Sequence, residues 1–125
     1  MKNETTVAPP NSMIAIMDRT DPKIPLRMGG RPVAWTASCI VIGTRSEMDG
    51  ATKIVLTDEI EDDNLTSEML PVFQGKLETP SCKLDVCTIL NKVLLEIPTT
   101  SISTMVKVFT NREREPTFVI VSVQK

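Results

Sequence analysis

Short runs in which apolar and polar residues alternate recur along the chain, and this pattern is typical of β-strands. Residues 52–58 show it plainly, because Ile54 and Leu56 alternate with Lys53 and Thr57. A period of two places successive side chains on opposite faces of a strand, as in a half-buried sheet. The pattern predicts further strands at residues 12–18, 33–43, 69–77, 82–88, 102–110 and 117–124.

Within the run at 33–43, the odd positions are predicted to face the core, Trp35 and Cys39 among them. In the run at 82–88, Cys82, Leu84 and Val86 share one face, while Lys83 and Asp85 share the other. The parity of these positions therefore assigns Trp35 and Cys82 to packing.

Two segments are less regular, and Gly75 interrupts a third. Residues 89–97 fit either a helical face or two strands, and the flanking prolines favour a strand, a turn at Asn91–Lys92 and then a second strand. Residues 59–68 are polar and acidic, which suits either a loop or one helical turn. Gly75 is predicted to form a β-bulge.

The spacing of the strands predicts an all-β fold, namely a two-sheet antiparallel β-sandwich of seven or eight strands with Greek-key connections. Residues 1–11 contain Pro9 and Pro10 and show no periodicity, so we expect a flexible N-terminal lead-in there. Residues 12–125 then form a single domain, which is an ordinary size for one hydrophobic core.

The core is predicted to be aliphatic, because aromatic residues make up only 3% of the chain. The four rings are expected to be large anchors within it. These rings are Trp35, Phe73, Phe109 and Phe118.

The chain contains no histidine and no tyrosine. Histidine-dependent nucleophilic catalysis is therefore excluded, as is a phenolic proton donor. The sequence also has no glycine-rich phosphate loop. We expect a protein that is not an enzyme and has no cofactor, and we rank an enzyme built on carboxylates alone last.

Acidic residues gather in one segment. Residues 47–78 contain nine acidic and two basic residues, a net charge of −7, whereas the parts before and after it are mildly basic. Such a segment can attract a basic protein surface, although an acidic patch also serves solubility alone. The predicted partner-binding residues are Asp58, Glu59, Glu61, Asp62, Asp63 and Glu68, with Arg112 and Arg114 as a secondary contact.

The same acidic segment has a second interpretation as a calcium site, since carboxylates are the ligands that Ca²⁺ prefers. The run from Asp58 to Asn64 lacks the glycine of a sharp calcium loop, so we favour a solvated loop and predict no metal. Direct binding of nucleic acid is disfavoured because the one dense charge run is acidic.

Cys39, Cys82 and Cys87 are odd in number, which favours free thiols in a reducing cytoplasm over one disulfide with a thiol left over. No stretch approaches the ~20 apolar residues that span a bilayer, and no signal peptide is visible. We therefore expect a soluble cytoplasmic protein.

The block from Phe73 to Ser81 (FQGKLETPS), Trp35-Thr36 and the final apolar run at 119–123 resemble small bacterial β-sandwich proteins. That group includes the competence-associated nuclease inhibitor, competence protein J, which the chain resembles. The resemblance implies a two-sheet sandwich that acts by binding, as an inhibitor or immunity protein for a nuclease or another toxin.

The sequence thus predicts a non-enzymatic module that binds another protein. The alternative is an accessory domain that binds a small molecule, a carbohydrate or calcium. We rank it second, because carbohydrate stacking needs exposed aromatic rings and the four rings are expected to be buried.

Overall fold

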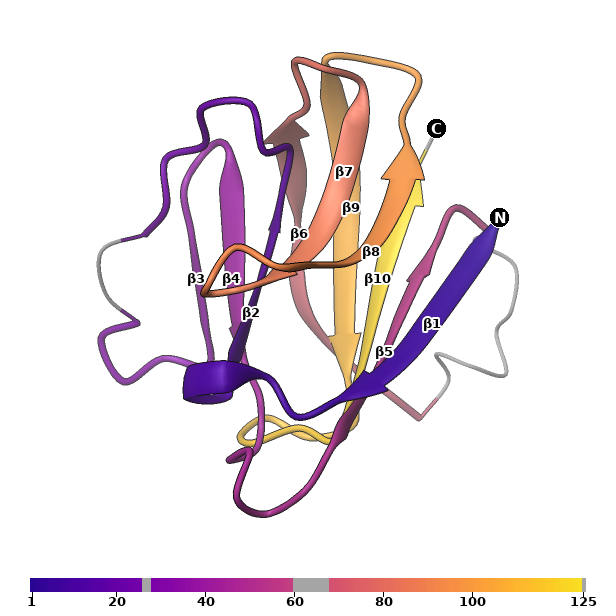
Figure 1. Cartoon of the computed structure of the whole chain (residues 1–125). Coiled ribbons are helices and arrows are strands. Elements are labelled where there is room, and N and C mark those ends of the chain that lie inside the picture. The colour runs from indigo at the N-terminus through magenta and orange to yellow at the C-terminus, as the bar shows by residue number, and fades with distance from the viewer. Residues whose placement is uncertain (26–27, 60–67, 125) are drawn as a thin grey trace.

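The computed structural model describes residues 1–25, 28–59 and 68–124, and within them ten strands form two five-stranded sheets (Figure 1). Sheet A has the order β1-β5-β10-β9-β6, and sheet B has the order β3-β4-β2-β7-β8. The strands of sheet A are β1 (Lys2–Val7), β5 (Thr52–Thr57), β6 (Leu70–Glu78), β9 (Ser103–Thr110) and β10 (Phe118–Gln124). Those of sheet B are β2 (Met13–Met17), β3 (Val33–Trp35), β4 (Cys39–Gly43), β7 (Lys83–Thr88) and β8 (Val93–Pro98), with a short 3₁₀ turn η1 (Pro10–Ser12) before β2.

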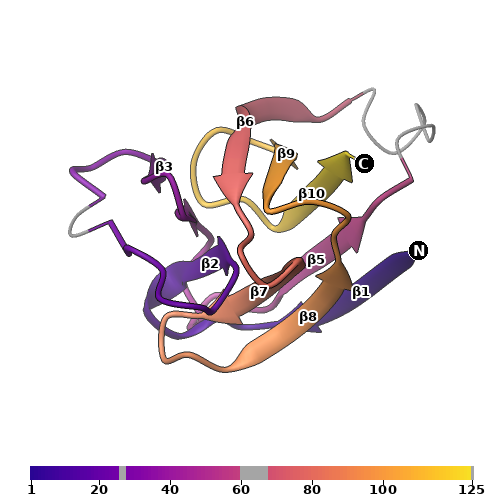
Figure 2. The same cartoon turned by 90° about the horizontal axis from the view of Figure 1, so that it is seen from above.

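The predicted all-β fold with two antiparallel sheets is confirmed, but the described residues form ten strands where seven or eight were predicted, because β1 was not expected and the run at 33–43 forms two strands. Neighbouring strands are antiparallel except for β10 and β5, which run parallel. The chain passes between the sheets at β1–β2, β4–β5, β6–β7 and β8–β9. Figure 2 shows the two layers from above, with β6 and β3 at the side where the sheets diverge.

One aliphatic core fills the space between the sheets. Alternate residues of sheet A, such as Leu56 and Val121, meet alternate residues of sheet B, such as Ile16 and Ile42. None of these side chains is more than about 1% exposed, and no aromatic ring is among the fully buried ones. The predicted aliphatic core is confirmed, but the rings are not its anchors, because Phe73, Phe109 and Phe118 are half-buried and Trp35 is exposed.

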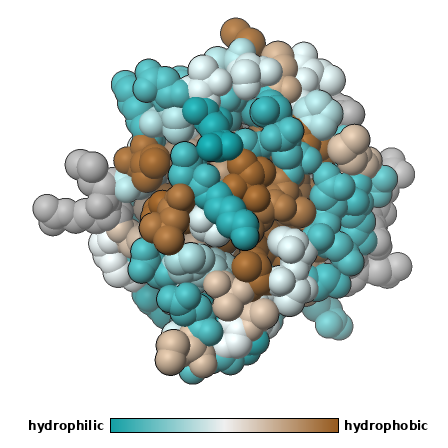
Figure 3. Space-filling model, in the orientation of Figure 1, coloured by the Kyte–Doolittle hydropathy of each residue, from teal (hydrophilic) through white to brown (hydrophobic). Residues whose placement is uncertain are grey.

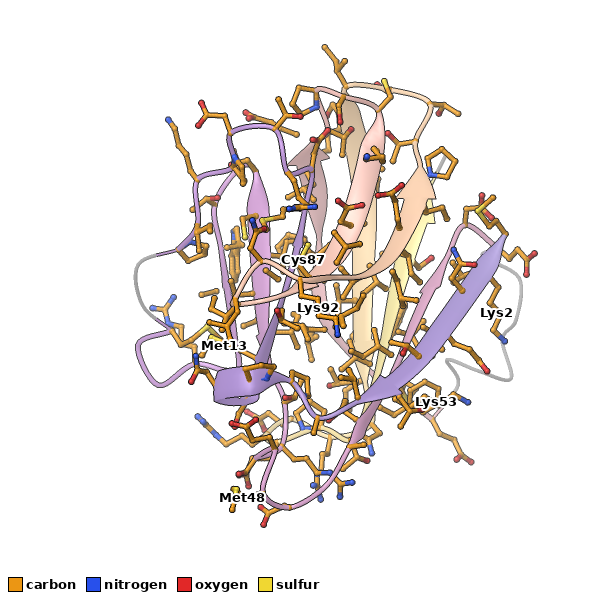
Figure 4. The ribbon with its side chains drawn as sticks, viewed as in Figure 1. Lys2, Met13, Met48, Lys53, Cys87 and Lys92 are labelled. Atoms are coloured by element: carbon orange, nitrogen blue, oxygen red, sulfur yellow. The ribbon has the colours of Figure 1, made fainter. Side chains whose placement is uncertain are left out.

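Sheet B is apolar on its outer face too. Ala15, Met17, Cys39, Val41 and Cys87 form a second buried cluster there. The strands β2 and β4 are therefore nearly continuous hydrophobic sequences, as expected for strands whose side chains are buried on both faces of the sheet. Figure 3 shows hydrophobic surface at the centre of this face, and Figure 4 places Met13 and Cys87 on it.

Residues 1–11 differ from the expected lead-in. Residues Lys2–Val7 form the edge strand β1, which pairs with β5 from Lys2–Thr57 to Val7–Thr52. The burial of β1 alternates, and that weak period of two was hidden by its polar composition, KNETTV.

The predicted strand at 33–43 is two strands joined by a turn. Thr36 donates its backbone amide to the Cys39 carbonyl, and the Ser38 hydroxyl accepts a bond from the Lys23 amide. These polar residues terminate β3, so that β4 folds back against it.

Three smaller predictions concern the β-bulge, the role of Cys82 and the segment 89–97. The bulge lies between Pro71 and Phe73, not at Gly75, which pairs regularly with Val106. Cys82 is exposed at a turn with a positive φ of 55°, so it has no packing role in the core. Within 89–97, the predicted second strand is confirmed as β8, but the turn comes earlier than predicted, at 89–91, so residues 89–90 belong to the turn and not to a strand.

We predict that Leu56→Ala lowers the free energy of unfolding by about 2–5 kcal/mol, because it leaves a cavity between the two sheets. Urea unfolding followed by circular dichroism measures the change. The control is Leu90→Ala, since Leu90 is 71% exposed in a turn and its loss should cost less than about 0.5 kcal/mol. Equal losses in the two variants would contradict the assignment of the core.

Candidate protein-docking surface

Asp58 and Glu59 follow the end of β5 and lie beside the N-terminus. The Met1 ammonium donates to Asp58 Oδ1 at 2.6 Å and to Glu59 Oε1 at 3.2 Å. The bond to Asp58, followed by that to Glu59, raises the pKa of the ammonium above its ordinary value. Two of the predicted partner-binding acids are therefore paired with a cation of this chain.

Glu68 lies at a different corner of sheet A. The end of β5 is level with Gln74 of β6, because Thr57 pairs with Ser122, Ser122 with Lys107, and Lys107 with Gln74. Glu68 precedes β6 by two residues and is three strands away, on the order of 20 Å from Asp58. Glu61, Asp62 and Asp63 fall outside the described residues, so the acidic surface as a whole stays a prediction.

The two predicted arginines lie in the loop between β9 and β10. Arg112 Nε donates to the Glu115 carbonyl at 2.9 Å, within its own loop. Arg114 Nη1 reaches across to the Gly30 carbonyl at 3.0 Å, which ties this loop to the segment before β3. Arg112 and Glu68 are both at the end of sheet A where β6 begins, whereas Arg114 faces the β3 side.

The most exposed ring of the chain is Trp35, at 56%, on the edge strand β3. It stands edge-on to Phe73 of β6, with ring centroids 5.3 Å apart and an interplanar angle of 66°. A backbone bond from the Glu78 amide to the Ala37 carbonyl joins the two edges beyond this pair. The rings thus fill the opening between the sheets at its rim.

Three hollows line up along this side of the molecule. The first, of about 550 Å³, lies between β3 and the segment before it and is lined by Met28, Arg31, Ala34 and Trp35 among others. The second, of about 480 Å³, lies between Trp35 and residues 72–76 of β6. The third, of about 360 Å³, lies between Arg31 and Arg114.

Shared residues connect these hollows, since Trp35 lines the first and second and Arg31 lines the first and third. We call this region the Trp35 surface. The charged residues that line it, within the described part of the chain, are Arg31, Lys76 and Arg114 against Glu115, so this described lining is net cationic. It combines an exposed aromatic centre with a charged rim, as protein-binding surfaces do.

The Trp35 surface was missed from the sequence, because the prediction of a single strand at 33–43 assigned the side chain of Trp35 to the core. The polar residues Thr36 and Ser38 were the available signal for a turn, and a turn there makes β3 a short edge strand.

No family model matches this chain, and no curated protein matches it. Two solved structures do. The first is the crystal structure of ComJ from Bacillus subtilis, an inhibitor of the DNA-degrading activity of NucA, with a TM-score of 0.66 at 10% sequence identity. The match covers 98% of this chain and 95% of ComJ.

The fold is similar to that of ComJ.

A second structure, the product of crocagin biosynthetic gene J, matches with a TM-score of 0.55 at 10% identity, over 97% of this chain and 94% of its own. The resemblance to ComJ predicted from the sequence is therefore confirmed at the level of the fold. Because the sequence identity is so low, no residue role can be carried over from these two proteins. The candidate site is therefore argued from the geometry of this chain alone.

On the outer face of sheet B of this ComJ-like fold, two carboxyl groups face each other. Asp85 of β7 pairs directly with Glu96 of β8. Asp85 is only 2% exposed, and among the described residues its Oδ1 has no hydrogen-bond partner. Burial, and then the neighbouring Glu96, raise the pKa of Asp85 to about 6 against the opposing effects of Lys83 and Arg19.

The buried thiols on the same face are poorly suited to reaction. Burial, and then proximity to Cys87, raise the pKa of Cys39 to about 12, and burial followed by Asp85 raises that of Cys87 to about 11. Thiols held protonated are weak nucleophiles and weak metal ligands. Within the described residues, no cluster of three or more potential metal ligands occurs.

The described residues likewise contain no helix with the length and hydrophobicity to cross a membrane.

Asp85 and Asp18 give opposite pH dependences of stability. The pKa of Asp85 is higher in the folded state than its ordinary 3.8, so its contribution falls as pH rises from about 4 to about 6. The pKa of Asp18 is lowered: burial raises it, but bonds from Ser81 and Thr20 more than offset that effect. The stability that Asp18 contributes is present at pH values above 3.8, the ordinary pKa of an aspartate, and is lost as the pH falls below it.

We therefore predict that Asp85→Asn raises the melting temperature at pH 7 by a few degrees and leaves it nearly unchanged at pH 4. Asp18→Asn should lower it at pH 7, because an amide nitrogen cannot accept the bonds from Ser81. Thermal melts from pH 3.5 to 8 measure both. A wild-type and an Asp85→Asn curve that stay parallel over this range would rule out the raised pKa.

Proposed function

We propose that this chain is a non-catalytic protein that binds and inhibits another protein, with a nuclease as the first candidate target. The observation that carries the proposal is the match of nearly the whole fold to ComJ, an inhibitor of a DNA-degrading enzyme. The match extends over both chains end to end, so no large catalytic insertion distinguishes the two folds.

The chemistry of the sequence is consistent with this proposal. Without histidine, the commonest general base near neutral pH is missing, and an inhibitor needs none. An inhibitor needs a surface with an anchor that a partner can desolvate, and Trp35 supplies one. The acidic segment that begins at Asp58 is separate from Trp35, and it supplies a long-range attraction to a basic part of the nuclease surface.

The proposal predicts stoichiometric loss of nuclease activity. Purified chain is added to a nuclease from the same cell, and the degradation of a fluorescent DNA duplex is followed. Activity should fall to its floor at about one chain per nuclease, while a gel-shift assay shows no binding of the DNA by the chain itself. If an excess of the chain leaves the activity of every nuclease tested unchanged, a nuclease is not the target.

Charge reversal separates the acidic segment from general electrostatics. A variant with Glu61 and Asp62 changed to Lys should weaken inhibition by at least about tenfold, with a larger loss at low salt. The matched control reverses Glu47 and Asp49, two exposed acids of the β4–β5 loop. Equal losses in both variants would show that net charge, not this segment, determines capture.

Carbohydrate binding is the second candidate, and the exposure of Trp35 favours it more than the sequence did. An exposed indole beside two hollows is a surface on which a sugar ring can stack. This function predicts a saturable change in tryptophan fluorescence with an oligosaccharide, lost in Trp35→Ala. A glycan array without signal, together with unchanged fluorescence, would remove this candidate.

A further inference from the structure

The backbone of β3 has one side bonded to β4 and one side open. The Gly43 amide donates to the Pro32 carbonyl, and the Thr36 amide donates to the Cys39 carbonyl, each at 2.9 Å. In an antiparallel pair the bonded residues alternate, so the amides and carbonyls of Val33 and Trp35 point away from β4. β3 is the last strand of sheet B, and no described strand covers that side.

The hollows lie on the two faces of this open edge. Val33 belongs to the core, so Ala34 faces the opposite side of the sheet. Ala34 lines the first hollow and Phe73 lines the second, whereas Trp35, at the rim between them, lines both. A strand added to β3 directs successive side chains to opposite faces, and therefore alternately into the two hollows.

The charge of the Trp35 surface indicates what such a strand carries. Arg31 stands at the first hollow and Lys76 at the second, and among the described residues that line these two hollows none is acidic. Arg114 extends the cationic lining at the third hollow, beside Glu115. An acidic segment is complementary to this lining, and a basic one is repelled.

We propose that the open edge of β3 binds an extended, acidic segment of a protein partner as an added strand, with an apolar side chain against Trp35. The proposal rests on the proposed function and names the contact through which that function operates. A polypeptide is favoured over single-stranded nucleic acid because the open amides and carbonyls of β3 match a peptide backbone, donor to acceptor.

Trp35 is the only tryptophan, and the chain has no tyrosine, so its fluorescence reports directly on this site. The probe is the peptide acetyl-Asp-Asp-Val-Phe-Val-Asp-Asp-amide, and its counterpart carries Lys in place of Asp. We expect a saturable blue shift with the acidic peptide and an affinity at least about tenfold lower for the basic one.

N-methylation tests the strand geometry. Methyl groups on the amides of alternate residues should abolish binding in one frame and leave it within about twofold in the other, because only one set of amides faces β3. Equal effects in both frames would overturn strand addition.

Protein variants test the cations. The double variant Arg31→Gln, Lys76→Gln should bind the acidic peptide with about tenfold lower affinity. The matched control is Lys2→Gln with Lys92→Gln, which removes the same charge from exposed positions away from β3 (Figure 4). Equal weakening in the two pairs would overturn the proposal, and so would an oligothymidylate that binds more tightly than the acidic peptide.

The nuclease assay distinguishes failure of this site from failure of the function. Wild-type chain that inhibits the nuclease but gives no shift with the acidic peptide overturns strand addition and leaves the proposed function standing. A peptide that binds as expected, with no nuclease inhibited, supports the site and removes the nuclease as its target.

Discussion

Burial of branched aliphatic side chains between two five-stranded sheets is the interaction on which the rest of this structure depends. Ile, Leu and Val fill the gap with small, well-defined shapes, and the core contains no ring that would force the sheets apart locally. Each fully buried side chain of this size contributes about 1.5–3 kcal/mol relative to an exposed one. The core is therefore sufficient without a disulfide, and the three cysteines are free.

Placing the rings outside the core has consequences at the rim. Where the sheets diverge between β3 and β6, Trp35 and Phe73 close the opening edge-to-face. Phe73 also covers Gly75, where an added Cβ would lie 3.1 Å from the ring. A glycine at 75 thus makes room for Phe73, and Phe73 in turn supports the exposed indole. The same aliphatic packing that stabilises the fold leaves its largest side chain available to a partner.

Much of the fold was predictable from the sequence, because period-two alternation is strong wherever a strand is half-buried. β5, β9 and β10 were found in this way. β1 was missed because its edge position needs little hydrophobicity, and the β3–β4 hairpin was missed because sheet B is apolar on both faces. Without alternation, only the polar residues at 36–38 mark the turn. The Trp35 surface was missed for the same reason, since the exposure of Trp35 depends on that weakly marked turn and on the distant strand β6.

The charges of this chain are separated in space as well as in sequence. Asp58 and Glu59 lie beside Met1 at the β1–β5 edge, and β3 lies on the opposite side of the molecule in both Figure 1 and Figure 2. The Trp35 surface, with Arg31 and Lys76, is cationic. A molecule with oppositely charged sides orients in the field of its partner before contact, which accelerates encounter in one orientation. Because a net charge of −2 hides this separation, overall composition is a poor guide to which side docks.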